Sequence, residues 1–306
     1  MSIKYNLVTV LGPTASGKTK LAAALANEFN GEIISCDSRQ FYRGMDIGTG
    51  KDYEDYIVNG QKVPVHLIDF LYPSDDYDVF HYQKDFLISY SSISSDNKIP
   101  FMVGGSGLYL SSILQQYRFV PVSMDEEKIA QFDSISTYEL KNRLLAISPK
   151  LHNTTDLIER DRIIRALIIT NESRNGGGEV SHPVIVSFNI YINPERQLLK
   201  DRIAERLEKR LNSGMIEEVK TLLENNIPAS RLNYFGLEYR FITMYLLNEI
   251  SLPEMIEKLR YAIFDFAKRQ VTWFRRMEKQ GVVLHKVDEP YFENASVLLQ
   301  KIGITS

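Results

Sequence analysis

The chain has 306 residues, 44% of them hydrophobic and 25% charged, which is ordinary for a globular protein with room for a full core and a second domain. Its 36 basic and 39 acidic residues give a formal net charge of −3, so any nucleic-acid site must be a local basic face. The only cysteine, Cys36, excludes an internal disulfide and favours a reducing compartment. We expect a cytoplasmic protein without a signal peptide or membrane span, because no stretch approaches the roughly 18 apolar residues that a span needs.

The first third of the chain alternates short apolar runs with helical patterns, which is typical of a parallel sheet wrapped by helices. Residues 5–11 predict a buried strand, and residues 18–29 predict the helix that follows it. Further strands are predicted at 32–36 and 99–103, and the second of these runs into a glycine-rich turn and a helix at 108–117.

The remainder of the chain divides into a polar insertion and a second part of the core. Residues 121–183 predict a small helical domain with helices at 138–147 and 157–171 and an exit loop at 175–178. Strand character returns at 183–192, and helices are then predicted at 195–212, 216–225 and 252–277. We therefore predict a core formed by residues 1–120 and 184–306, interrupted by the insertion.

The segment after the first strand matches the phosphate-loop pattern G-x-x-x-x-G-K-[ST] in full, as Gly12-Pro13-Thr14-Ala15-Ser16-Gly17-Lys18-Thr19. Its glycines let backbone N–H groups converge on an anion, and the start of the next helix adds its positive dipole end. Lys18 can reach a phosphate oxygen and Thr19 can hold Mg²⁺. The predicted fold is therefore α/β, with a P-loop NTPase-like core whose parallel sheet is flanked by helices, and a phosphate or diphosphate as ligand.

The second predicted strand ends in Asp37, which would emerge beside the phosphate loop at the carboxyl edge of the sheet. An aspartate there can be a metal ligand, a general base or a turn cap, and the residues alone favour none of the three. The histidines and Cys36 show no metal-ligand spacing, so we expect no zinc site, and we interpret His66 as structural.

Five blocks of the sequence resemble the tRNA dimethylallyltransferase (isopentenyltransferase) family in order and spacing. They are the phosphate loop, Asp37-Ser38-Arg39-Gln40 with Tyr42-Arg43-Gly44-Met45-Asp46-Ile47-Gly48-Thr49, His66-Leu67-Ile68-Asp69, Gly104-Gly105-Ser106-Gly107-Leu108-Tyr109, and Ala267-Lys268-Arg269-Gln270-Val271-Thr272-Trp273-Phe274. A weaker block, Asp161-Arg162-Ile163-Ile164-Arg165-Ala166-Leu167, falls in the insertion, where the family carries a similar arginine motif. Together the blocks span residues 8–276.

The resemblance implies that an adenosine amino nitrogen, immediately 3′ of the anticodon in tRNA, attacks dimethylallyl diphosphate and expels diphosphate. Ionisation of the allylic donor requires the enzyme mainly to neutralise the diphosphate, for which the phosphate loop, Lys18, Mg²⁺ and arginines are suited. Asp37 is our candidate to accept the proton of the amine. Ser106 stands where the family usually has threonine and keeps the hydroxyl that can bond a phosphate or bridging oxygen.

The arginines of the 195–212 helix divide into two groups. Arg196 and Arg202 fall on positions that resemble the family's diphosphate-binding arginines, and the planar guanidinium suits bidentate phosphate contacts. For Arg210 we predict a solvated helix face with ordinary surface ion pairs.

Residues 258–279 carry seven basic and two acidic side chains and are the best local candidate for RNA contact. The aromatic residues of this stretch are interpreted mainly as core, whereas for Trp273 packing and base stacking are equally favoured. The resemblance adds predicted tRNA-binding residues, namely Ser38, Arg39, Gln40, Arg162, Arg165, Lys268, Arg269 and Gln270. One departure is Gly236-Leu237-Glu238-Tyr239, where the family has Gly-Tyr-Lys-Glu.

Three other functions stay open at this point. A phosphate-loop kinase would use ATP and Asp37 as base, a related prenyltransferase would act on a free adenine nucleotide, and a nucleotide-gated switch would bind RNA without chemistry. We expect a monomer that binds the anticodon stem-loop.

Overall fold

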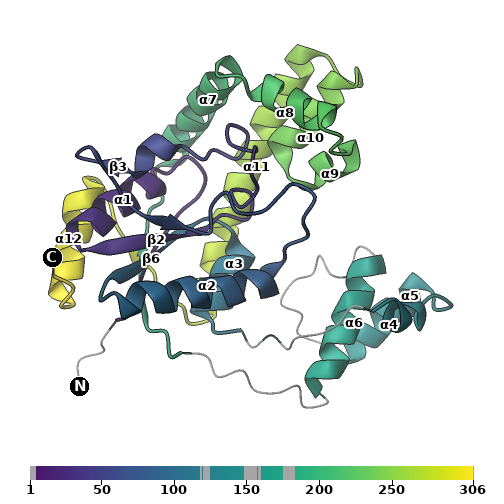
Figure 1. Cartoon of the computed structure of the whole chain (residues 1–306), viewed down its shortest axis with the longest axis horizontal. Coiled ribbons are helices and arrows are strands. Elements are labelled where there is room, and N and C mark those ends of the chain that lie inside the picture. Colours follow the sequence, from purple (N-terminus) through teal and green to yellow (C-terminus); the bar gives the residue numbers. More distant parts are fainter. Residues whose placement is uncertain are drawn as a thin grey trace. The chain divides into compact units, whose positions relative to one another are not determined.

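The computed structural model describes residues 5–117, 119, 125–147, 157, 160–174 and 183–305. The chain divides into two units, of which the larger comprises Met1–Gln116 and Val184–Ser306 and the smaller Tyr117–Pro183 (Figure 1). The smaller unit begins slightly earlier in the chain than the predicted insertion at residue 121.

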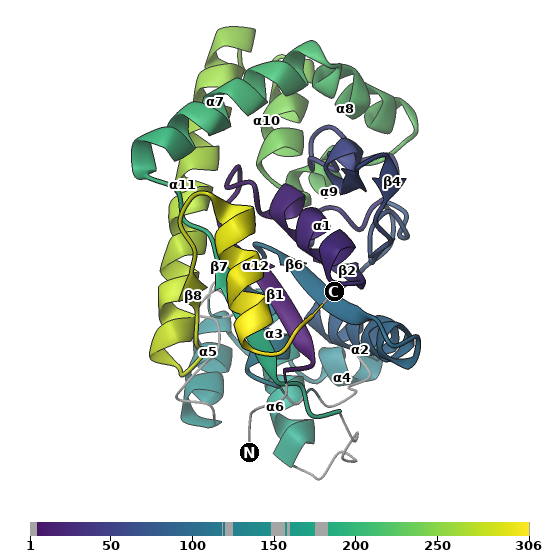
Figure 2. The same ribbon diagram turned by 90° about the vertical axis from the view of Figure 1, so that its left-hand side faces the viewer.

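The larger unit is built on a six-stranded sheet in which every pair of neighbouring strands is parallel (Figure 2). In sheet order, its strands are β5 (Val65–His66), β2 (Gly31–Cys36), β6 (Ile99–Gly104), β1 (Leu7–Leu11), β7 (Ser187–Tyr191) and β8 (His285–Lys286). A small antiparallel pair, β3 (Ile57–Val58) and β4 (Gln61–Lys62), follows the short 3-10 helix η1 (Tyr53–Tyr56).

Helices cover both faces of this sheet because its strands carry apolar side chains on both sides. In β1, Leu7 and Leu11 join one core cluster, whereas Val8 and Val10 join the other, as the two-residue period of a strand requires. The first cluster includes residues of α2 (Val79–Ser95), α3 (Gly107–Leu114) and α11 (Leu252–Lys279). The second includes residues of α1 (Lys18–Glu28) and α12 (Tyr291–Lys301). The prediction of a parallel sheet flanked by helices is therefore confirmed.

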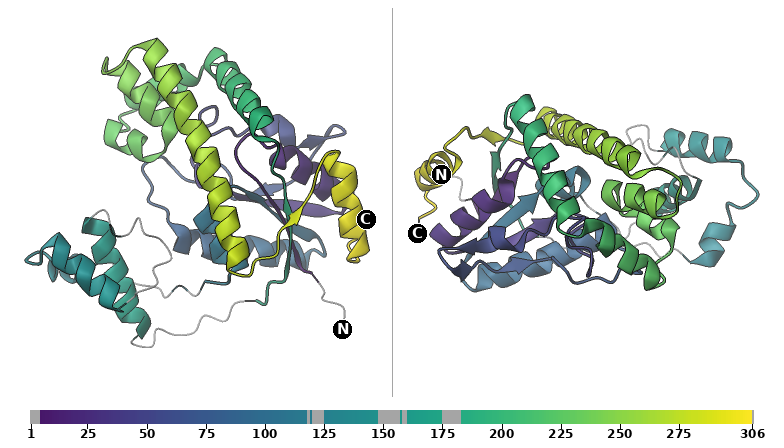
Figure 3. Two further views of the ribbon diagram at one scale, coloured as in Figure 1. Left: turned by 180° about the vertical axis from the view of Figure 1, so that it is seen from behind. Right: turned by 90° about the horizontal axis from the view of Figure 1, so that it is seen from above.

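A group of helices stands beyond the sheet and is joined to it by α11 (Figure 3). Its other members are α7 (Arg196–Asn212), α8 (Met215–Glu224), α9 (Ala229–Tyr234) and α10 (Leu237–Leu246). The long α11 begins where Ser251 and Glu254 form a reciprocal capping box, with a proline in the first turn. Within the described residues, no helix combines the length and apolar character that a membrane span requires.

The smaller unit contains three described helices, α4 (Glu126–Ala130), α5 (Thr137–Ile147) and α6 (Arg160–Arg174). Its own hydrophobic core consists of Leu140, Leu144, Ile163, Ile164, Leu167 and Ile168. The exit loop predicted at 175–178 lies outside the described residues.

Candidate active site

Three chain segments meet at the carboxyl edge of the sheet because of the strand register. Leu11 of β1 and Cys36 of β2 are both paired with Gly104 of β6. The phosphate loop, Asp37 and the Gly104–Gly107 turn therefore leave the sheet side by side, at the edge where open parallel sheets bind their ligands.

A cavity of about 810 Å³ opens at this edge, and we call it the central cavity. It is lined by the phosphate loop, Asp37 to Gln40, the turn after β6, the cavity side of α7, residues 235–239 and part of α11. Most of the blocks recognised in the sequence thus contribute to a single site.

The backbone of the phosphate loop is shaped for an anion. Ala15 and Gly17 have φ angles of 60° and 87°, which turn the chain into α1. Among the described residues, no side chain caps the start of α1 at Gly17, so the first N–H groups of the helix can donate to an anion. Ser16 Oγ is buried and has no hydrogen-bond partner among the described residues.

Lys18 is half-buried in the wall of the central cavity, where Nζ donates to the Pro13 carbonyl oxygen at 3.3 Å. The pKa of Lys18 is lowered to about 8, mainly by burial; the charge of Asp37 opposes this shift, and the charges of Arg206 and Arg210 add to it. A bound diphosphate would favour the charged ammonium, because an anion close to a buried cation offsets its lost hydration.

Asp37 sits in a turn that Ser106 braces from the neighbouring strand end. Asp37 Oδ1 accepts a hydrogen bond from the Arg39 backbone N–H at 3.1 Å. The Ser38 backbone N–H donates to Ser106 Oγ at 3.1 Å, and that hydroxyl lies 3.3 Å from Ser38 Oγ. Ser106 thus lines the central cavity and also fixes the turn that carries Asp37.

Gln270 of α11 links the phosphate loop to the turn that follows β6. Its Oε1 accepts from the Thr14 backbone N–H at 2.8 Å, and its Nε2 donates to the Gly105 carbonyl oxygen at 3.0 Å. The residue is only 7% exposed. The sequence placed Gln270 among the tRNA-binding residues, whereas in the structure both ends of its amide tie α11 to the loops.

The arginines of α7 are arranged differently from the prediction. Arg196 is exposed and lies outside the lining of the central cavity. Arg202 lines the cavity, with Nη2 at 3.2 Å from Glu289 Oε1. Arg206, which the sequence did not single out, lines it too and places Nη1 3.5 Å from Thr14 Oγ1.

The prediction of a solvated Arg210 is wrong. Its side chain is 12% exposed and lines the central cavity, because α7 is covered on this side by the loop at Gly50 and by the segment that begins α10. Helical periodicity indicates which residues share a face, but it does not indicate which other part of the chain covers that face.

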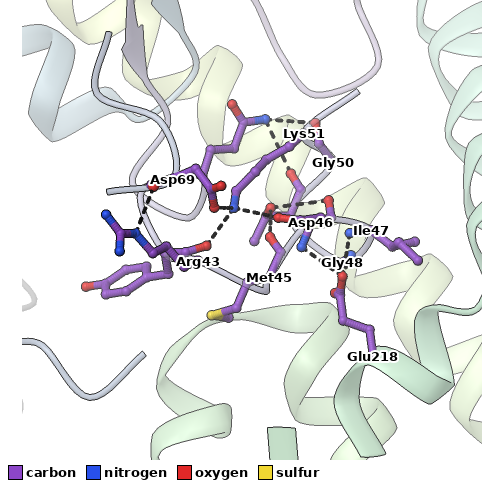
Figure 4. A network of polar contacts seen from close by, with 12 residues as sticks. Arg43, Met45, Asp46, Ile47, Gly48, Gly50, Lys51, Asp69 and Glu218 are labelled. Carbon is purple, nitrogen blue, oxygen red and sulfur yellow. Dashed lines mark hydrogen bonds and ion pairs between the residues drawn. The ribbon is translucent and has the colours of Figure 1, made fainter. Parts of the chain in front are cut away.

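A polar network that the sequence did not reveal holds the loop from Tyr42 to Lys51 (Figure 4). Glu218 of α8 accepts hydrogen bonds from the backbone N–H groups of Asp46, Ile47 and Gly48 at 2.8, 2.7 and 2.9 Å. The Tyr239 hydroxyl donates to the same carboxylate at 2.7 Å. In the sequence, the block Asp46-Ile47-Gly48-Thr49 drew attention to this loop, but it did not indicate that Glu218 is its partner.

The other end of the loop is fixed by Lys51, whose ammonium group is fully buried. Nζ donates to the Tyr42 carbonyl oxygen at 2.6 Å and to carboxylate oxygens of Asp46 and Asp69 at 2.7 and 2.6 Å (Figure 4). Between the two anchors, the Gly50 carbonyl oxygen accepts from Gln40 Nε2 at 2.8 Å. Gln40 is therefore oriented by the loop.

The residues predicted to bind tRNA fall into separate places. Ser38, Arg39, Gln40 and Arg269 line the central cavity, and the Arg39 guanidinium lies 5.5 Å from the Tyr234 ring centre. Lys268 is exposed on α11 and pairs with Asp265 at 3.0 Å. Arg162 and Arg165 lie on α6 of the smaller unit, where Arg165 is exposed and Arg162 is half-buried.

Trp273 is held between α11 and α3. Its indole N–H donates to Ser111 Oγ at 2.9 Å, and its ring lies against Gly107 so closely that a side chain there would clash. The ring also borders the central cavity. Packing thus accounts for its position, and part of its edge faces the ligand space.

A phosphate loop at the carboxyl edge of a parallel sheet, faced by arginines from a helical layer, defines a phosphate-binding α/β protein of the P-loop class. A family model described as IPP transferase matches residues 40–277, and one described as isopentenyl transferase matches residues 5–65. The chain belongs to the IPP transferase family.

Similar proteins cover nearly the whole chain. A protein of Phocaeicola vulgatus named tRNA dimethylallyltransferase 2 is 48% identical over 286 residues, 93% of each chain. A protein of Syntrophus aciditrophicus named tRNA dimethylallyltransferase 1 is 46% identical over 94% of this chain and 95% of its own. The crystal structure of the full-length tRNA isopentenylpyrophosphate transferase from Bacillus halodurans has a TM-score of 0.70 at 33% identity, covering 98% of this chain and 97% of that one.

Proposed function

We propose that this chain transfers the dimethylallyl group of dimethylallyl diphosphate to N6 of the adenosine immediately 3′ of the anticodon in tRNA, releasing diphosphate. The observation that carries the proposal is that the central cavity joins the phosphate loop, Asp37 and an arginine-lined wall in a member of the IPP transferase family. The names of the relatives, tRNA dimethylallyltransferase, support the acceptor and the transferred group.

The diphosphate end of the donor is assigned to the phosphate loop. Backbone N–H groups at the start of α1, Lys18 and arginines of α7 would surround it with positive charge. Allylic C–O cleavage leaves the electron pair on the diphosphate, so this positive charge stabilises the transition state more than the ground state.

Mg²⁺ fits this site by the chemistry of its donors. The Thr19 hydroxyl lines the same cavity as the carboxylates of Asp37, Asp52 and Asp55, and hard oxygen donors suit this cation. Among the described residues, no group of three His, Cys, Asp or Glu side chains could hold a metal. Thr19 would therefore hold Mg²⁺ together with substrate phosphate oxygens, and the ion would supply charge neutralisation of the leaving group.

Asp37 is assigned as the proton acceptor. The exocyclic amine of adenine is a weak nucleophile because its lone pair is delocalised into the ring, so loss of its proton to a carboxylate assists attack. The new N–C bond forms as the C–O bond breaks, and the proton passes to Asp37. Ser106 keeps the Asp37 turn in place through its bonds to Ser38.

The adenosine must leave its stack to reach a site inside a cavity. Ser38, Arg39 and Gln40 border the space next to Asp37 and are assigned to the bases around the target. Basic residues of α11, among them Lys268 and Arg269, and Arg162 and Arg165 of the insertion are assigned to the phosphates of the anticodon stem-loop. We assign the enzyme to the cytoplasm, acting as a monomer.

The test mixes the purified protein with Mg²⁺, dimethylallyl diphosphate and a tRNA transcript with an adenosine-rich anticodon loop, and looks for prenylated adenosine by mass spectrometry. Product on tRNA and none on adenosine monophosphate is expected. Product on the mononucleotide alone would move the acceptor to free nucleotides. A folded protein that modifies neither would contradict prenyl transfer and favour a kinase that uses ATP.

A further inference from the structure

Arg210 is a largely covered cation whose hydrogen-bonding capacity is not met by the described residues. Its Nε and Nη2 atoms are inaccessible to solvent and have no acceptor among the described residues. The third nitrogen, Nη1, is not one of these buried atoms. Because the residue lines the central cavity, the exposed part of the guanidinium faces that cavity. A buried charged donor without an acceptor is costly, which points to a partner that arrives from the cavity.

Glycine at position 50 permits this placement. Gly50 has a φ of 70°, and a side chain there would clash with Nη2 of Arg210 and come within 2.5 Å of Nη2 of Arg206. The loop that contains Gly50 is anchored at both ends by Glu218 and Lys51 (Figure 4). The position of the guanidinium is therefore built into the fold and does not depend on its own hydrogen bonds.

The surroundings of Arg210 identify the partner as an anion at the phosphate loop. A second, small cavity of about 20 Å³ is lined by Thr14 and Ala15 of the loop together with Arg206 and Arg210. The charges of both arginines act on the half-buried Lys18. Three cations thus converge on the loop, an arrangement in which like charges repel until an anion is bound.

Two carboxylates lie near Arg210, but among the described residues neither accepts a hydrogen bond from its buried Nε and Nη2 atoms. Asp52 Oδ2 lies 2.6 Å from Arg206 Nη2 but 3.8 Å from Nη2 of Arg210, beyond hydrogen-bond distance. Glu238 borders the same two cavities, and burial raises its pKa above the ordinary value although Arg210 opposes the shift.

We infer that Arg210 binds the diphosphate group directly, through the exposed side of its guanidinium, as a donor-binding residue additional to Lys18 and Arg202. This inference rests on the proposed function and deepens its donor site. It assigns Arg210 to the diphosphate and not to tRNA, because the residue reaches the cavity from the phosphate-loop side.

The experiment measures the binding of inorganic diphosphate with Mg²⁺ by isothermal titration calorimetry, which requires neither tRNA nor turnover. Arg210→Met should weaken binding by about 10-fold to 100-fold, the range expected for one charge-assisted hydrogen bond. Arg240→Met, at an exposed arginine outside the cavity, is the matched control and should bind as the wild type does. Arg210→Lys, which keeps the charge, should be intermediate.

A double variant tests whether Arg210 binds the ligand or only balances the charge of Glu238. If Arg210 binds diphosphate, Arg210→Met/Glu238→Gln should stay as weak as Arg210→Met. Recovery of wild-type affinity in the double variant would overturn the inference, since Arg210 would then only balance Glu238. Affinity of Arg210→Met within twofold of wild type, with an unchanged melting temperature, would overturn it as well.

The transferase assay with wild-type protein keeps the two proposals apart. Suppose that the wild type binds diphosphate more tightly than Arg210→Met does, but prenylates neither tRNA nor nucleotide. This result would contradict the proposed function and leave the Arg210 inference standing. With an active enzyme, Arg210→Met should raise the KM for dimethylallyl diphosphate and leave the KM for tRNA within twofold. The reverse pattern would overturn the inference.

Discussion

In the proposed reaction, Asp37 lies where donor and acceptor would meet. One carboxylate oxygen is held by the Arg39 backbone N–H, and the charge of the carboxylate acts on Lys18. Asp37→Asn keeps the shape and an acceptor for Arg39 but cannot take a proton at neutral pH. We expect single-turnover prenyl transfer to fall by about 100-fold or more, the contribution typical of a general base.

Binding of Mg²⁺-diphosphate to the Asp37→Asn variant, measured by calorimetry, should stay within a few fold of wild type. A large loss of that affinity would contradict the base role and identify Asp37 as a metal ligand, the alternative that the residues alone left open.

Gln270 connects α11 to both the phosphate loop and the turn after β6. In Gln270→Glu, an acceptor would face the Gly105 carbonyl oxygen in place of the Nε2 donor, while the bond from Thr14 could persist. A buried mismatch of this kind costs about 1–3 kcal/mol, so we expect the free energy of unfolding to fall by that amount in urea titrations. Lys268→Ala, two positions earlier and exposed, should leave the free energy of unfolding unchanged.

At the residue scale, the phosphate loop could be predicted because the pattern that defines it consists of consecutive residues. Arg210 and the structural role of Gln270 could not, because each depends on segments far away in the chain: Gly50 for the first, Thr14 and Gly105 for the second. Sequence spacing indicates a shared helix face but contains no information on what covers it.

At the scale of elements, α8 and the loop before η1 behave as one structural part through Glu218. A glutamine at this position has only one oxygen to replace the two that accept three backbone N–H groups and the Tyr239 hydroxyl. Glu218→Gln should therefore accelerate amide hydrogen exchange at Asp46, Ile47 and Gly48 by about 10-fold, the effect of losing about one charge-assisted bond.

The neighbouring Glu217 supplies the matched control for this prediction. It lies on the exposed side of α8, so Glu217→Gln should leave exchange in the loop unchanged. Equal exchange in wild type and Glu218→Gln would contradict the view that this carboxylate holds the loop.

β2 carries a buried carboxylate whose contribution to stability depends on pH. Burial raises the pKa of Glu32, but hydrogen bonds from Lys98 at 2.5 Å and His66 at 2.6 Å outweigh this and hold it below the ordinary value of 4.5. A depressed carboxyl pKa stabilises the fold above pH 4.5, and this stabilisation is lost as the pH falls through the folded-state pKa.

Comparison with Glu32→Gln isolates this effect from that of other carboxylates. The difference in unfolding free energy between wild type and variant should be largest near neutral pH and shrink steadily below pH 4.5, as measured by urea unfolding. A difference that is constant with pH would rule out this ion-pair contribution.

At the scale of the whole molecule, the sequence predicted the parallel sheet, the flanking helices α1, α3 and α11, and the insertion, since each follows from local periodicity. It did not predict the strand order β5-β2-β6-β1-β7-β8, and among the helices it missed α2, α9, α10 and α12. Strand order depends on crossovers between distant segments, and helices in proteins acquire most of their stability from packing against the rest of the fold.

The insertion can be tested as a separable part because the chain leaves and re-enters the larger unit at adjacent points. Gln116 Nε2 donates to the Ile185 carbonyl oxygen at 3.0 Å, and the smaller unit has its own core. Replacing residues 117–183 with a short Gly-Ser linker should therefore leave the larger unit folded and its affinity for Mg²⁺-diphosphate within a few fold of wild type.

Transfer to tRNA by this deletion variant should fall by on the order of 100-fold, because the phosphate contacts assigned to Arg162 and Arg165 would be lost. The full-length double variant Arg162→Ala/Arg165→Ala should show part of the same loss, chiefly as a higher KM for tRNA that rises further with salt. If the deletion variant binds diphosphate and still prenylates tRNA at the wild-type rate, the insertion is not part of the tRNA site. Substrate recognition would then lie entirely with the central cavity and α11.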